Sequence, residues 1–125
     1  MLAANAISLS NQLAVLVELC RECADACASC ADAFAASGLT DTFRTCESVC
    51  SDCADVCGAT AQVASRYAGG DTRALGALLR ACAKACGECA AECANHPLDA
   101  AMHCAQASLL CKQACERLAD SLRWR

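Results

Sequence analysis

Residues 46–57 read CESVCSDCADVC, and residues 82–93 read CAKACGECAAEC. Both segments space their cysteines by four, three and four positions, which places all four thiols on one face of an α-helix. Residues 20–30 (CRECADACASC) carry four more cysteines, spaced by three, four and three. Residues 104–115 carry three, with Ser108 where the register predicts a fourth. The pattern indicates four helices, each of which turns a seam of thiols inward.

The composition agrees with long helices and excludes several classes of protein. The 125 residues include 15 cysteines but only one proline, and the formal net charge is −4. A negative charge with few aromatic rings argues against nucleic-acid binding. Glu18 interrupts the apolar residues 13–19, and no basic segment precedes them. We therefore expect no signal peptide, no membrane span and a cytoplasmic location, where cysteines remain thiols and their clusters indicate metal or redox sites.

Three turn signals divide the chain, at residues 37–38, 69–71 and 95–97. Short turns make consecutive helices antiparallel neighbours, so the sequence predicts an all-α, up-down-up-down four-helix bundle with a cysteine-lined core. We expect one metal-binding domain over residues 1–125. Asp71 is the expected N-cap of the third helix, and Pro97 is expected in the first turn of the fourth. The predicted helices span residues 5–36, 40–68, 71–95 and 97–123.

Antiparallel threading brings all the cysteines to the same end of the bundle, in a column about 16 Å long. The predicted layers are Cys30/Cys46/Cys93/Cys104, Cys27/Cys50/Cys89/Ser108, Cys23/Cys53/Cys86/Cys111 and Cys20/Cys57/Cys82/Cys115. Toward the other end the register continues into a leucine core made of Leu9, Leu13, Leu16, Leu75, Leu78, Leu79, Leu118 and Leu122. The sequence thus predicts a tube plugged by leucines, whose open end carries His96, Met102 and His103.

Such a column favours many soft, monovalent ions. A buried thiolate without a counter-charge costs several kcal/mol, so the bound metal must neutralise the column. Fifteen Cu(I) ions would neutralise the 15 thiolates, whereas four tetrahedral zinc ions would supply only eight positive charges. Cu(I) is thiophilic and accepts two or three sulfur ligands, which CxxxC pairs one helical turn apart can provide. We therefore predict that multiple Cu(I) ions bind to all 15 cysteines of the four seams.

Two alternative functions remain open at this point. The thiols could form a zinc or mixed-metal buffer, or the CxxC pairs, such as Cys50/Cys53 and Cys86/Cys89, could serve a thiol redox protein. No strand-helix unit of the thioredoxin type surrounds any CxxC pair. The sequence also lacks a phosphate loop or a candidate acid-base pair, so we expect a protein that is not an enzyme.

The repeated CxxxCxxCxxxC runs at 46–57 and 82–93 closely resemble those of the bacterial copper storage proteins. The resemblance covers essentially the whole chain. It implies a bundle that fills its core with Cu(I), for storage or detoxification, and that commonly forms a homotetramer. The chain resembles the cytosolic branch of the family. His96, Met102 and His103 are similar to the metal ligands at the mouth of that family's bundle, whereas Ser108 departs from the full pattern. Copper chaperones or efflux proteins are the protein partners that such a role would need.

Overall fold

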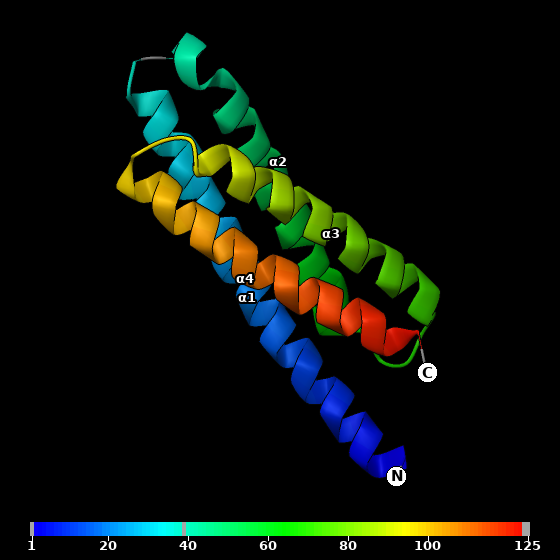
Figure 1. Ribbon diagram of the computed structural model, residues 1–125. Coiled ribbons are helices and arrows are strands. Elements are labelled where there is room, and N and C mark those ends of the chain that lie inside the picture. Colours follow the sequence, from blue (N-terminus) through cyan, green and yellow to red (C-terminus); the bar gives the residue numbers. More distant parts are fainter. Residues whose placement is uncertain (1, 39, 124–125) are drawn as a thin grey trace.

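The computed structural model describes residues 2–38 and 40–123, with side chains described for residues 8–38 and 44–123. Its four helices run antiparallel to one another in chain order, and Figure 1 shows the N-terminal part of the first helix extending beyond the others. The helices are α1 (Leu2–Ala36), α2 (Thr40–Arg66), α3 (Thr72–Cys93) and α4 (Asp99–Leu122). Each helix packs against two others in a closed ring, α1-α2-α3-α4, so that α1 lies diagonally across from α3. The predicted all-α, up-down-up-down bundle is confirmed.

The helix ends follow local turn chemistry, with one correction to the prediction. Asp71 caps α3, because its side chain accepts a hydrogen bond of 2.8 Å from the backbone N–H of Arg73. Pro97, however, does not lie in the first turn of α4. Leu98 occupies the N-cap position with an extended backbone (φ −107°, ψ 141°), and the helix begins at Asp99. The proline therefore belongs to the connection between α3 and α4.

The interior is divided into a thiol half and a leucine half, as the register predicts. All 15 cysteines are free and fully buried, with 0% exposure. In the other half Leu9 and Leu78 are half-buried. The remaining predicted leucines are buried: Leu13, Leu16, Leu75, Leu79, Leu118 and Leu122.

Helix α2 contributes small residues to the leucine half, which the leucine pattern did not reveal. Thr60, Ala61 and Ala64 are buried there. The Thr60 hydroxyl donates to the carbonyl of Val56 at 2.7 Å, so this polar group is satisfied within its own helix.

None of the four helices, over the residues that the structure describes, combines the length and apolar character needed to cross a membrane.

Candidate metal centre

The thiols form a dense network in the centre of the bundle. Neighbouring Sγ atoms are separated by 3.4 Å at Cys50–Cys93 and by up to 4.0 Å at Cys30–Cys93. Pairs one turn apart on a helix meet at similar distances, 3.9 Å for both Cys23–Cys27 and Cys53–Cys57. The helical period therefore sets the spacing along each seam, and bundle packing sets the spacing between seams.

Several groups of thiols are arranged so that one ion could be held by sulfurs from different helices. In each group the Sγ atoms all lie within 4.8 Å of one another. Cys23, Cys27, Cys104 and Cys111 each belong to more than one group, which makes the network continuous rather than a set of separate tetrahedral sites. The groups include Cys20/Cys82/Cys111/Cys115, Cys23/Cys57/Cys86/Cys111, Cys30/Cys50/Cys93/Cys104, Cys23/Cys27/Cys53 and Cys27/Cys89/Cys104.

The predicted layers need correction on α2, where Cys50 of the second layer lies 3.4 Å from Cys93 of the first, and on α4. Cys104 was expected in the first layer, but its Sγ lies 3.5 Å from both Cys27 and Cys89 of the second layer. Cys111, expected in the third layer, lies 3.6 Å from Cys20 of the fourth. Side chains of packed helices insert between those of their neighbours, so α4 sits between the predicted levels.

Burial raises the pKa of some cysteines of the column, whereas hydrogen bonds from other thiols lower the pKa of others. Desolvation raises the pKa of Cys30 to about 11, and it is also the main cause of a raised pKa at Cys46. A hydrogen bond with Cys27 lowers the pKa of Cys104 to about 4, and one with Cys115 lowers the pKa of Cys111 to about 6. Hydrogen bonds from neighbouring thiols also lower the pKa of Cys23, Cys82 and Cys89. Thiolates therefore form most readily where other thiols of the network donate to them.

The mouth of the column, the end that bears Cys30, Cys46 and Cys93, is closed by an aromatic side chain. Phe34 lies one helical turn beyond Cys30 and is fully buried. Its ring contacts the imidazole of His96, which is 17% exposed. The sequence analysis missed Phe34, although its position four residues after Cys30 continues the register of α1.

The three predicted mouth ligands occupy different environments. His96 packs beside the end of the column, and its Nε2 lies 3.5 Å from Oε1 of Glu92. Met102 is 56% exposed near the start of α4. His103 is exposed in a shallow surface groove that it shares with Glu22 and Asp25 of α1. Of the three, His96 alone is packed against the aromatic side chain that closes the column.

Known proteins with this arrangement bind copper. A family model described as copper storage protein matches residues 9–120. The chain belongs to the copper storage protein family. Membership of this family indicates storage of copper, rather than a zinc buffer or a thiol redox activity, as the role of the thiol network.

Solved structures give the same result. The chain resembles a cytosolic copper storage protein from Streptomyces lividans carrying five coppers, with a TM-score of 0.87, 39% identity and coverage of 90% of this chain and 96% of that one. The Streptomyces lividans protein loaded with 10 copper equivalents matches with a TM-score of 0.85, 40% identity and coverage of 88% and 85%. A variant of it with a histidine replaced by alanine matches with a TM-score of 0.86, 40% identity and coverage of 90% and 96%. No curated protein sequence matches the chain.

Proposed function

We propose that this copper storage protein holds Cu(I) in the cytosol at about one ion per cysteine. The observation that carries the proposal is the network of 15 fully buried thiols, with neighbouring Sγ atoms 3.4 to 4.0 Å apart. The Streptomyces lividans relative, which is a cytosolic protein, has been solved with bound copper. Each Cu(I) replaces one thiol proton, and the proton leaves to solvent. We propose that residues 1–125 act as one domain for this purpose, without catalysis.

Charge balance supports monovalent ions in this core. All 15 thiols are fully buried, and no lysine or arginine side chain is buried among the described residues. A thiolate there is stabilised by a bound cation or by donated hydrogen bonds. One Cu(I) per thiolate leaves the core neutral, whereas divalent ions at four sulfurs each would leave it negative. We propose as ligands Cys20, Cys23, Cys27, Cys30, Cys46, Cys50, Cys53, Cys57, Cys82, Cys86, Cys89, Cys93, Cys104, Cys111 and Cys115.

We propose that copper is exchanged at the mouth, through His96, Met102 and His103. His96 packs next to the end of the column, and the exposed thioether of Met102 offers a soft ligand to an arriving ion. The next residue of α4, His103, is also exposed. Because the thiols themselves are buried, ions must be handed over at the surface. Copper chaperones or efflux proteins are the donors and acceptors that we propose.

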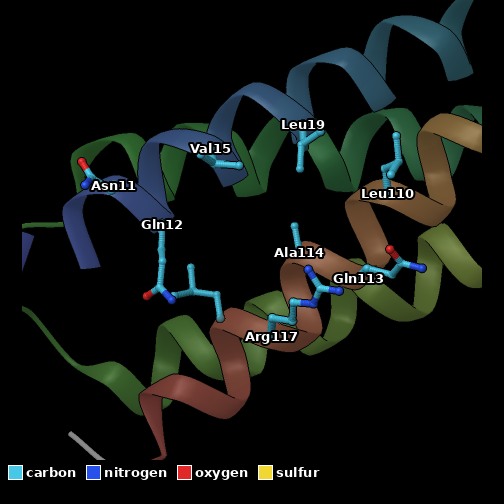
Figure 2. A pocket seen from close by; sticks show the side chains of 9 residues that line it. Asn11, Gln12, Val15, Leu19, Leu110, Gln113, Ala114 and Arg117 are labelled. Atoms are coloured by element: carbon cyan, nitrogen blue, oxygen red, sulfur yellow. The ribbon is translucent and has the colours of Figure 1, made fainter. Parts of the chain in front are cut away.

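An exposed apolar face supports self-association. A groove of about 410 Å³ lies between α1 and α4 and is lined by Val15, Leu19 and Leu110 (Figure 2). Arg117 lines the same groove from α4, about two helical turns from Leu110. Leu110 also lines the neighbouring groove, which contains the carboxylates of Glu22 and Asp25. A two-fold axis near Leu110 would place Arg117 of one copy against Glu22 of the other. We propose this face as one interface of a homotetramer.

Titration of the reduced protein under anaerobic conditions tests the storage function. Cu(I) and, separately, Zn(II) are added in competition with a chelator of known affinity, and bound metal and thiols are both assayed. We expect Cu(I) to saturate near one ion per cysteine, with zinc bound more weakly and at fewer sites. Saturation at about four ions of either metal would contradict the proposal, because it would indicate separate tetrahedral sites.

A further inference from the structure

Basic side chains are concentrated on the face of the bundle formed by α3 and α4, which lies opposite the α1–α2 face. Two adjoining grooves lie between these helices, of about 560 and 490 Å³, and Arg80 lines both of them. Five of the ten lysine and arginine residues line these grooves, although the net charge of the chain is −4. We call the two together the basic groove and define it by Arg73, Arg80, Lys84, Lys112 and Arg123.

Among the described residues, most of these cations have no carboxylate partner. Arg73 lies near Asp71, the N-cap of α3, with 3.8 Å between Nε and Oδ1. Two further carboxylates, those of Glu88 and Glu116, line the larger groove. In the part of the chain that the structure describes, neither of these two forms an ion pair with a basic residue of the groove. The basic groove therefore carries an excess of positive charge that can attract an external anion.

Two glycines of α3 make room for cations in the basic groove. A Cβ atom on Gly76 would lie 3.3 Å from Nη1 of Arg80. A Cβ atom on Gly87 would lie 3.5 Å from Cε of Lys112 and 3.9 Å from its Nζ. At Gly58, in the interior of α2, the corresponding atom would meet no side chain of the described residues beyond its chain neighbours. Glycine lowers the stability of a helix relative to alanine, so α3 loses helix stability at both positions where it seats a basic side chain.

The shape of the basic groove fits an extended peptide. Arg73 and Lys84 are 11 residues apart on α3, and Lys112 and Arg123 are 11 residues apart at the other side of the groove, so each row of cations spans about 16 Å. An extended chain covers this distance with about five residues. Small residues also line the groove, which allows a peptide backbone to approach: Gly76, Ala83, Gly87, Ala91 and Ala119.

We propose that the basic groove binds an extended acidic segment of a partner protein. The guanidinium groups of Arg73, Arg80 and Arg123 can each form paired hydrogen bonds with a carboxylate. Glu88 and Glu116 favour a peptide over a chain of phosphates, because they repel phosphate but accept hydrogen bonds from peptide N–H groups. All 15 thiols are buried, so binding at this surface does not require copper and is independent of the proposed storage function.

Fluorescence anisotropy of a labelled hexaglutamate peptide tests this inference on the full, reduced chain at low ionic strength. We expect saturable binding that weakens as salt is added, because the contacts are exposed charge pairs. Arg80→Glu should weaken binding about tenfold, since it replaces an attraction by a repulsion. Arg21→Glu is the matched control; it changes the net charge equally but lies in the groove between α1 and α2, so it should leave binding nearly unchanged.

A second pair of variants tests the site without changing the net charge. Gly76→Ala displaces the guanidinium of Arg80 and should weaken binding about threefold. Gly58→Ala makes the same replacement in α2 and should leave the affinity as it is. Equal affinity of the two glycine variants would overturn the seating of Arg80.

Three results would overturn the site itself: no binding at low salt, equal losses in Arg80→Glu and Arg21→Glu, or displacement of the peptide by tripolyphosphate at lower concentrations than by unlabelled peptide. The last result would identify a phosphate site instead. Copper capacity, measured on the same variants, should be the same in all of them. Its loss in the unmodified chain would contradict storage and leave the peptide site standing.

Discussion

The imidazole of His96 meets the ring of Phe34 edge to face, with 5.3 Å between the ring centroids and 69° between the ring planes. This pair joins the C-terminal part of α1 to the turn after α3, immediately beyond the last thiols of both helices. Phe34 is fully buried at this end of the column, so an ion that enters along the axis meets a filled interior rather than the open end that the sequence predicted.

Phe34→Ala should accelerate both uptake and chelator-driven removal of Cu(I) without changing the final capacity, because it removes the ring that closes the column. Loss of a buried phenylalanine also costs about 3–5 kcal/mol of stability. Phe34→Leu is the control, because it retains much of the apolar volume. Its copper exchange rates and its stability should lie between those of the unmodified protein and those of Phe34→Ala. Stopped-flow mixing measures the rates. Identical rates in all three proteins would show that copper does not pass this ring.

Replacing His96, Met102 and His103 together by alanine should slow copper uptake and removal and leave the endpoint stoichiometry nearly unchanged, because the thiolates determine the equilibrium. Among the single variants, His96→Ala should have the largest effect, since His96 alone contacts the ring that closes the column. The same stopped-flow measurement checks this order. If the triple variant loads at the unmodified rate, copper enters between the helices.

The apoprotein should lose stability as the pH rises above 9. Burial raises the pKa of the Cys30 thiol from its ordinary value of 9.0 to about 11. Between these values the unfolded chain has lost the proton and the folded chain keeps it, so stability falls by up to about 1.4 kcal/mol per pH unit for such a thiol. Cys104 and Cys111, whose pKa values are lowered, are ionised in both states there and add no slope.

Urea unfolding under reducing, anaerobic conditions at pH 8, 9 and 10 measures this loss. Cys30→Ser should show a shallower decline, and the copper-loaded protein should show none from its thiols, because copper has already displaced their protons. Stability of the apoprotein that stays constant from pH 8 to 10 would contradict the raised pKa of the buried Cys30 thiol.

The apoprotein should remain a helical bundle, because the leucine half packs without metal. Leu79→Ala, at a fully buried position, should destabilise the apoprotein by about 2–5 kcal/mol and leave copper capacity unchanged. Leu78→Ala, at a half-buried position, is the matched control and should cost less. Circular dichroism and urea unfolding give both results. An apoprotein that is unfolded until copper is added would be inconsistent with this division of the core.

Leu110→Glu should weaken self-association, because Leu110 is 54% exposed and lines both grooves of the α1–α4 face. Val63→Glu is the control; Val63 is an exposed apolar residue of α2, outside that face. Light scattering coupled to gel filtration gives the mass of each species. The proposed interface is wrong if both variants retain the mass of the unmodified protein or if both lose it equally.

The sequence was sufficient to predict the bundle and the burial of every cysteine, because the helical period fixes which residues share a face and short turns fix which helices are neighbours. It could not predict the axial position of α4. Periodicity contains no information about sliding of one helix along another, which depends on the path of the turn before Asp99 and on how side chains interlock. Cys104 consequently contacts Cys27, at 3.5 Å, as well as approaching the first layer.

The boundary between thiols and leucines is a single step of the same helical register, from Cys20 to Leu16 on α1 and from Cys82 to Leu79 on α3. Moving this boundary requires only point substitutions in an unchanged backbone. Each leucine exchanged for cysteine would add a ligand and remove apolar volume that holds the empty protein together. Capacity and metal-free stability are thus opposed along one axis of the molecule, and evolution can adjust the ratio between them one residue at a time.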